Sequence, residues 1–188
     1  MKRFRIISVL LVSILVLSLV ILPNSPKAEA LEETVYKNDV PVLAQKSDFN
    51  YRVQNNRIVI TQYLGTNEKI IIPETIDNLP VFAVTAKAFS DSNITYIKLP
   101  STLGTLASNA FNECDSLLRI DIADANPYYC SVDGVVYSKD RTTLKAFPAG
   151  RSGDFTIPNG VTTVANFAFY RCYQLENVNM YNTVTSIG

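Results

Sequence analysis

The sequence predicts a β-rich repeat solenoid, in which short copies of one motif stack on each other. Ala-Phe pairs at positions 88–89, 110–111 and 168–169 each follow an apolar-rich segment, and the motif around them recurs at a spacing of about 23 residues. Within a copy, apolar residues stand at i, i+3 and i+5, and the final step of two is the period of a strand. A unit this small buries its apolar side only against neighbouring units, so we expect one continuous core.

The N-terminus is typical of a secretory signal peptide. Residues 2–5 carry three basic side chains, residues 6–22 are mostly apolar, and residues 28–30 read Ala-Glu-Ala. We therefore expect cleavage after Ala30 and a secreted or cell-surface protein. An uncleaved anchor helix is the alternative, because about 17 apolar residues are the minimum for crossing a bilayer. The polar, unpatterned residues 31–47 are expected to form a flexible lead-in.

The charge of the remaining chain excludes some classes of partner. Removal of residues 1–30 takes away four of the 17 Lys and Arg and one of the 17 Asp and Glu, which leaves 13 basic and 16 acidic side chains. The basic residues are scattered along the chain, so we expect no nucleic-acid partner. There is no second long apolar segment, so we expect no membrane contact after cleavage.

We place the repeat domain at residues 48–188. It contains two predicted β-hairpins and ends in an incomplete repeat. Residues 48–65 alternate on either side of a polar turn and predict a hairpin that caps the first unit. In residues 126–150, turns at Asp133-Gly134 and Lys139-Asp140 flank the apolar strand 135–138, and residues 143–147 read as its antiparallel partner. They predict an inserted hairpin, which either fills one turn of the solenoid or projects to bind a partner. The final repeat stops at Gly188 before its Ala-Phe pair, which indicates a longer protein or else a frayed last unit.

Together these features resemble the BspA-like leucine-rich repeats of bacterial surface proteins. The matching residues are Leu99-Pro100, Ile157-Pro158, the segment 184–188, the Ala-Phe pairs, the cysteines three residues after two of the phenylalanines, and the hairpin at 126–150. The resemblance implies an α/β leucine-rich repeat solenoid with short strands and short helical turns. It also implies a surface adhesin. Cys130 departs from the pattern, because that hairpin usually carries a serine there.

The sequence offers little for catalysis. Histidine is absent, which excludes the common Ser-His and Cys-His systems. Asp121 and Asp124 are the nearest candidates for a carboxylate pair, but solvated or turn-forming side chains are the simpler interpretation. With Asn126 they also lack the alternate spacing and distal glutamate of a calcium loop. We therefore expect no enzyme activity, no cofactor and no metal.

Five residues are expected to form the spine of the stack: Phe89, Phe111, Phe169, Cys114 and Cys172. The three rings should stack as a column, and the change Phe111→Ala should cost roughly 3–5 kcal/mol, as truncation of a large buried aromatic does. Cys114 and Cys172 occupy equivalent places in units taken to be adjacent, about 5 Å apart and within disulfide reach. Buried free thiols are the alternative that we favour.

Outward-facing strand residues should form the ligand-binding face, because stacking aligns them in rows across a sheet. The rows are Lys69, Tyr96, Arg119, Asn177 and Ile71, Lys98, Asp121, Asn179. This mixture of charges, amides and one aromatic ring suits a protein or glycan ligand, although an ordinary solvated face has the same composition. The sequence thus favours a binding or adhesion module. The alternative function is a repeat spacer or targeting segment in a longer exported protein.

Overall fold

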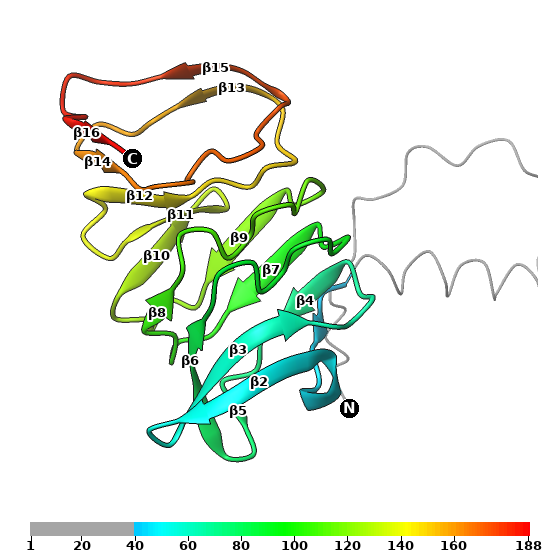
Figure 1. Cartoon of the computed structure of the whole chain (residues 1–188). Coiled ribbons are helices and arrows are strands. Elements are labelled where there is room, and N and C mark those ends of the chain that lie inside the picture. The colour runs from blue at the N-terminus through cyan, green and yellow to red at the C-terminus, as the bar shows by residue number, and fades with distance from the viewer. Residues whose placement is uncertain (1–39) are drawn as a thin grey trace, which may run out of the picture. The chain divides into compact units, whose positions relative to one another are not determined.

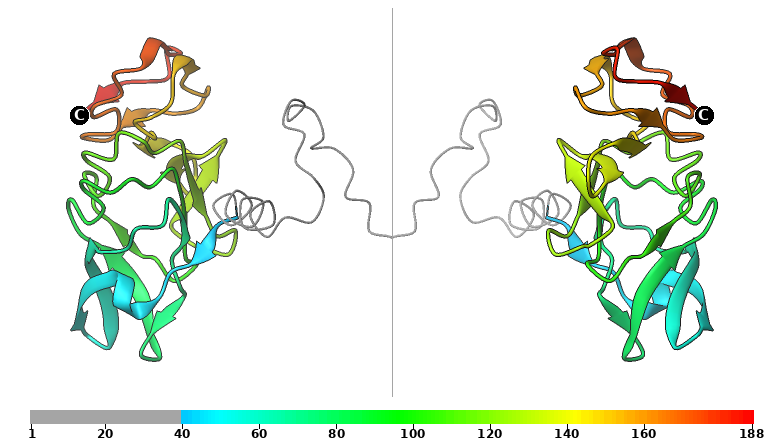
Figure 2. Two further views of the ribbon diagram at one scale, coloured as in Figure 1. Left: turned by 90° about the vertical axis from the view of Figure 1, so that its right-hand side faces the viewer. Right: turned by 90° about the vertical axis from the view of Figure 1, so that its left-hand side faces the viewer.

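The computed structural model describes residues 40–188, which form a stack of β coils. Figure 1 shows the strands following one another along a single axis, from β2 and β3 at one end to β15 and β16 at the other. The side views in Figure 2 show the same succession of coils. The predicted signal peptide and residues 31–39 of the predicted lead-in lie outside the described residues. Within residues 40–188, no helix has the length and apolar character needed to cross a membrane.

Sixteen strands and one 3-10 helix make up this region. They are β1 (Val42–Leu43), η1 (Lys46–Asp48), β2 (Phe49–Gln54), β3 (Arg57–Tyr63), β4 (Lys69–Ile71), β5 (Thr75–Ile76), β6 (Leu79–Val84), β7 (Tyr96–Leu99), β8 (Thr105–Leu106), β9 (Arg119–Ile122), β10 (Tyr129–Val132), β11 (Val135–Ser138), β12 (Thr143–Ala146), β13 (Gly153–Thr156), β14 (Thr163–Val164), β15 (Leu175–Asn179) and β16 (Ser186–Ile187).

The prediction of short helical turns, and with it the α/β class, is wrong for the described part of the chain. The 3-10 helix η1 is the only helical element in residues 40–188. The segments around the Ala-Phe pairs are tight bends, in which Lys87, Asp91, Glu113 and Arg171 adopt positive φ angles of 57°, 59°, 66° and 58°. A residue in this left-handed region interrupts a right-handed helix. The fold is therefore an almost purely β solenoid.

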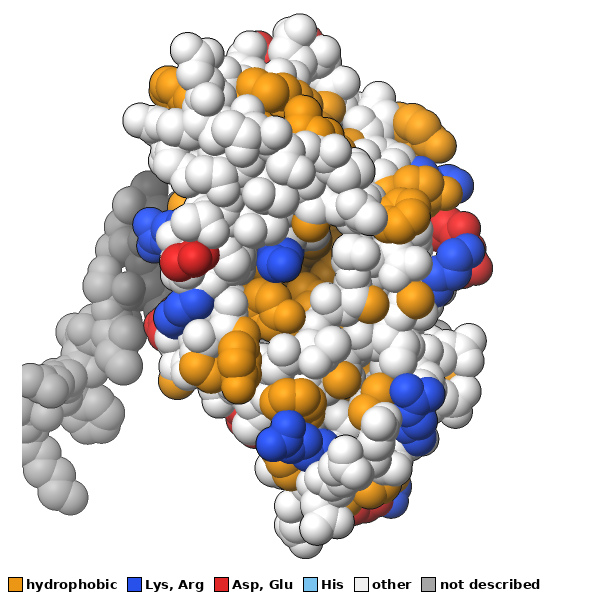
Figure 3. Space-filling model, turned by 60° about the vertical axis from the view of Figure 1, so that its left-hand side comes forward, with side chains coloured by type: hydrophobic (Ala, Val, Ile, Leu, Met, Phe, Trp, Pro, Cys, Tyr) orange, Lys and Arg blue, Asp and Glu red, His pale blue; other side chains and the backbone are white. Residues whose placement is uncertain are grey.

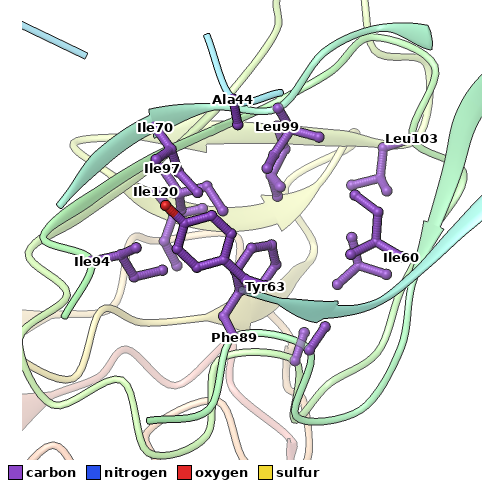
Figure 4. Close-up of a cluster of buried hydrophobic side chains, with 14 of the residues drawn as sticks. Ala44, Ile60, Tyr63, Ile70, Phe89, Ile94, Ile97, Leu99, Leu103 and Ile120 are labelled. Carbon is purple, nitrogen blue, oxygen red and sulfur yellow. The ribbon is translucent and has the colours of Figure 1, made fainter. Parts of the chain in front are cut away.

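Two sheets enclose the larger part of the core. Strands β1, β4, β7 and β9 form a parallel sheet, while β2, β3 and β6 form another with β5 and β8 alongside β6. Ile70, Ile97 and Ile120 pair in register across the first sheet and are fully buried. Figure 4 shows these side chains pointing toward Phe89 and Ile60, the latter from β3 in the second sheet. The alternating apolar pattern thus closes a core between two layers.

The end of the predicted lead-in belongs to this core. Strand β1 pairs in parallel with β4, and the Ala44 N–H donates to the carbonyl of Ile71 at 2.9 Å. Ala44 is only 3% exposed. The prediction of a flexible segment is therefore wrong for residues 42–44, which supply the first strand of the sheet. The hairpin expected at 48–65 is present as the antiparallel pair β2 and β3.

The inserted hairpin is itself a turn of the solenoid. Strand β11 pairs antiparallel with both β10 and β12, but β12 then pairs in parallel with β14 as an ordinary coil would. Val135, Val136 and Tyr137 are buried, so the hairpin is laid into the stack. It ends on a fourth Ala-Phe pair, Ala146–Phe147, whose Phe147 N–H donates to Ala168 O just as Phe89 N–H donates to Ala110 O. Of the two predicted roles, the structure therefore supports the one in which the hairpin fills a turn of the solenoid.

This additional coil divides the predicted aromatic column. Phe89 contacts Tyr63 at a centroid distance of 6.0 Å and stacks on Phe111 at 5.5 Å, as expected for neighbouring coils. Phe169, however, packs against Phe147 at 5.2 Å in a second cluster of buried residues. The column from Phe89 to Phe169 is therefore not formed by three consecutive units.

Candidate binding surface

Three adjacent strands bring together six of the eight residues predicted for the binding face. The pairing of β4, β7 and β9 sets Lys69 beside Tyr96 and Tyr96 beside Arg119. The second row, from Ile71 through Lys98 to Asp121, follows from the same register. The regular spacing of the buried isoleucines determines this alignment, because outward residues alternate with inward ones.

Hydrogen bonds hold one corner of this face in a defined geometry. The Tyr96 hydroxyl donates to Asp121 Oδ2 at 3.1 Å, and Arg119 Nε donates to the same oxygen at 3.0 Å. Partial burial, followed by the nearby Asp121 charge, raises the pKa of Tyr96. The hydrogen bond to Asp121 raises the pKa of Arg119. At neutral pH both groups therefore stay protonated, and the corner presents a fixed arrangement of aromatic, cationic and anionic groups.

The edge of the face carries an apolar residue that the sequence analysis missed. Leu43 of β1 pairs with Ile71 of β4, and 57% of Leu43 is exposed. Lys98, one strand further on, is also exposed. Leu43 could not be recognised from the sequence because β1 has only two residues and follows an unpatterned segment. We define the sheet face as Leu43, Lys69, Ile71, Tyr96, Lys98, Arg119 and Asp121.

Asn177 and Asn179 do not belong to the sheet face, so this part of the prediction is wrong. Both lie on β15, which pairs with β13 in a separate two-stranded sheet. Asn177 Nδ2 donates to Asp154 Oδ1 at 2.8 Å within that sheet. The inserted coil lies between β9 and β13 in the stack. The Ile120 N–H of β9 donates to Gly134 O, which lies in the turn between β10 and β11 of that coil. Residues 155–181 are thus not the unit next to residues 94–117.

The same error affects the two spine cysteines. Cys114 is fully buried in the larger core, whereas Cys172 packs against the second cluster, and all three cysteines are free thiols. The Cys114 thiol donates to Phe89 O at 3.0 Å. Burial raises the pKa of Cys114 to about 12 and that of Cys172 to about 11. Both side chains are therefore protonated at neutral pH and serve as small apolar residues.

We expect the native protein to show the same intact mass with and without reductant. Reduction of a disulfide would add about 2 Da, and no such shift should occur because all three cysteines are free thiols. In native alkylation at pH 8, Cys114 should stay unmodified, because it is fully buried and its pKa lies well above the reaction pH. Mass spectrometry of peptides after alkylation measures this directly. Unfolding in urea should expose all three thiols and serves as the control. Rapid native labelling of Cys114 would contradict the burial.

The carboxylates considered for catalysis do not form an acid-base pair in the structure. Asp121 accepts hydrogen bonds from Tyr96 and Arg119, and Asp124 is exposed. In the part of the chain that the structure describes, no group of three or more His, Cys, Asp or Glu side chains could hold a metal ion. Asn126 has a structural role instead: it is fully buried, and its side-chain amide links the coil of β7 and β8 to the start of β10.

One protein-family model matches most of residues 40–188. The model of the BspA type leucine rich repeat region matches six copies of the repeat, over residues 62–131 and 143–188. A comparison with curated proteins finds no significant match.

Solved structures with similar folds come from bacterial repeat proteins. A leucine-rich repeat protein from Eubacterium ventriosum is 25% identical, with a TM-score of 0.55 over 63% of this chain and 32% of its own. A leucine rich cell surface protein from Faecalibacterium prausnitzii is 26% identical, with a TM-score of 0.52 over 79% of this chain and 45% of its own. The pneumococcal vaccine antigen PcpA, at 23% identity and a TM-score of 0.54 over 66% of this chain and 36% of its own, shares the fold. The chain thus spans less than half the length of these proteins.

Proposed function

The chain belongs to the BspA-type leucine-rich repeat family of bacterial surface proteins, and on this basis we propose that it is an exported binding protein whose sheet face engages a protein partner. The observation that carries the proposal is the in-register alignment of Tyr96, Arg119 and Asp121 on adjacent strands. The signal-peptide pattern of residues 1–30 supports the export part of the proposal. The cell-surface protein of Faecalibacterium prausnitzii, which has a similar fold, supports the same location.

The chemistry of the sheet face supports a protein ligand. Tyrosine and arginine are enriched where protein interfaces concentrate their binding energy, and Tyr96 and Arg119 lie side by side here. Leu43 and Ile71 add an apolar edge, while Lys98 and Asp121 supply charges of both signs. The hydrogen bonds to Asp121 restrict the Tyr96 and Arg119 side chains before binding, which reduces the entropy lost on association.

A binding assay with a double variant tests this proposal. Tyr96→Ala/Arg119→Ala removes the aromatic and cationic groups and leaves the inward isoleucines in place. We expect retention on immobilised extracellular protein ligands to fall by at least about ten-fold, because interface hot spots of these residue types contribute about 2 kcal/mol or more. Surface plasmon resonance against a panel of extracellular-matrix proteins and bacterial surface glycans measures the loss.

The matched control is Asn177→Ala/Asn179→Ala, which alters exposed residues of the separate β13–β15 sheet. This variant should bind as the unmodified protein does. Equal retention of both variants would defeat the sheet-face proposal and favour a spacer role for the repeats. Binding to the glycans alone would replace the protein partner with a sugar.

A further inference from the structure

A second surface, on the other sheet, carries a hollow that the proposed function does not use. Its volume is about 340 Å³, which lies in the range of small-ligand sites. It opens on the outer side of β2, β3, β6 and β8, whose inward residues Ile58, Ile60 and Val84 belong to the core. Figure 3 shows a face of the molecule on which Lys and Arg side chains lie directly beside hydrophobic ones.

A β-bulge in β6 builds the floor of this hollow. Ile58 pairs with Val81, but the next residue, Val59, pairs with Ala83, so Phe82 is the extra residue. Phe82 and Ala83 are both half-buried between the fully inward Val81 and Val84. Bulges of this kind redirect a side chain and occur often beside binding sites. Here the bulge adds a phenylalanine to the outer surface of the sheet.

Phe82 in turn orients an arginine. Its ring lies over Gly104, where an added Cβ atom would overlap the ring carbons Cε2 and Cζ, so glycine lets the ring keep this position. The Arg57 guanidinium carbon lies 4.0 Å from the centroid of the same ring. Stacking of this kind holds the guanidinium plane while its N–H groups remain directed outward for a planar anion.

The charges of the hollow are of one sign. Arg52 and Arg57 both line it, and the lining contains no Asp or Glu. Across residues 40–188, neither arginine forms an ion pair with a carboxylate. Both arginines are exposed and line the hollow together with the apolar residues Val59, Phe82 and Ala83. An anion placed here would form charge-assisted, bidentate hydrogen bonds without displacing an existing partner.

The remaining lining residues specify more than an anion. Gln54, Asn55, Thr85 and Thr105 add amide and hydroxyl groups around the arginines. Strands β3 and β6 each have neighbours on both sides, so their backbones are already paired and cannot add a peptide strand. On this floor, recognition falls to the side chains, whose amides and hydroxyls can pair with ligand hydroxyls and whose arginines can pair with a carboxylate. We propose that this hollow binds an acidic sugar, a saccharide unit that bears a carboxylate.

Isothermal titration calorimetry with trigalacturonate and neutral galactotriose tests the proposal on the full chain. We expect the acidic trisaccharide to bind and the neutral one to bind at least about ten-fold more weakly. Arg57→Gln and Arg52→Gln should each reduce the affinity about ten-fold or more, since hydrogen bonds to charged groups contribute at least that factor. Arg57→Lys keeps the charge but loses the planar stack, and should recover only part of the affinity.

Lys139→Gln is the matched control, because it removes one exposed cation that belongs neither to the sheet face nor to the hollow. Trigalacturonate binding should be unchanged in this variant. The arginine variants should retain the partner binding of the sheet face, which separates this proposal from the proposed function. Unchanged binding in Arg57→Gln, or equal binding of galactotriose, would overturn the inference. Equal binding of triglutamate would assign the hollow to acidic peptides, and full displacement by sulfate at constant ionic strength would reduce it to a nonspecific anion site.

Discussion

Replacing Phe89 with alanine is expected to lower the free energy of unfolding by roughly 3–5 kcal/mol, the usual range for truncating a fully buried phenylalanine. The Phe89 ring is 0% exposed and lies between the rings of Tyr63 and Phe111, at 6.0 and 5.5 Å. Alanine would leave a cavity in the middle of the stack, which neighbouring coils cannot fill without moving their backbone bends. Urea denaturation followed by circular dichroism measures the change.

Phe111→Ala provides the matched comparison. The ring of Phe111 is only partly buried and packs against the core from its edge, so its removal should cost less than that of Phe89. This revises the expectation from sequence, in which Phe111 was a central member of the column. Equal losses for the two variants, or a loss below about 1 kcal/mol for Phe89→Ala, would contradict the arrangement of the rings.

The sequence predicts those parts of the fold that depend on local period. The apolar spacing of Ile94, Ile97 and Leu99 is repeated in the neighbouring units, and it correctly placed β7 and β9 in register. The pair Ala146–Phe147 was not recognised as part of a repeat, because Pro148 follows it and the surrounding residues alternate as in a hairpin. A hairpin and a solenoid coil share the period of a strand, so periodicity alone does not separate them.

That one missed coil explains two further errors. The units on either side of this coil were taken as adjacent. This led to the predictions that Cys172 lies beside Cys114 and that the sheet face extends to Asn177 and Asn179. In the structure the β10–β12 coil separates both pairs of positions. The prediction of short helical turns failed for a different reason. Positive φ values at polar residues such as Lys87 and Glu113 depend on tertiary packing and leave no clear mark on composition.

The candidate sites differ in how far sequence could predict them. The rows through Tyr96 and Arg119 follow from the two-residue alternation of strands, although the shared hydrogen-bond acceptor Asp121 needed coordinates to be seen. The hollow on the other sheet depends on a shifted register between Ile58 and Val59. A bulge changes which residues face outward without changing the alternating pattern on its partner strand. The stack of Arg57 on Phe82 was therefore not predictable.

Asn126→Ala is the second substitution expected to have a large effect, a loss of roughly 2–4 kcal/mol of unfolding free energy. The Asn126 side chain is fully buried, and its Nδ2 donates to Pro100 O at 3.1 Å and Leu103 O at 2.8 Å. Its Oδ1 accepts from the N–H groups of Tyr128 and Tyr129, both at 2.8 Å. Alanine would remove all four hydrogen bonds. Pro100 O would keep only the 3.3 Å bond from the Leu103 N–H, and the other three groups would lose the partner that Asn126 provides, which lowers stability most where the group is buried.

Asn126→Asp separates hydrogen-bond geometry from volume, because aspartate has nearly the same shape but, when ionised, cannot donate to Pro100 O and Leu103 O. The N–H groups of Tyr128 and Tyr129 favour the ionised carboxyl, but we expect full burial and the two facing carbonyls to outweigh them and to raise its pKa above the ordinary value of about 3.9. Its neutral form donates one hydrogen bond, so stability should be greater at pH 4 than at pH 7 relative to the unmodified protein and decline as the pH rises through the raised pKa. Thermal unfolding at both pH values measures this difference. The control is Asp124→Ala, which alters an exposed neighbour and should change the free energy of unfolding by no more than about 0.5 kcal/mol. A loss in Asp124→Ala as large as that in Asn126→Ala would show that any substitution in this turn is destabilising. The four hydrogen bonds of Asn126 would then not explain the loss.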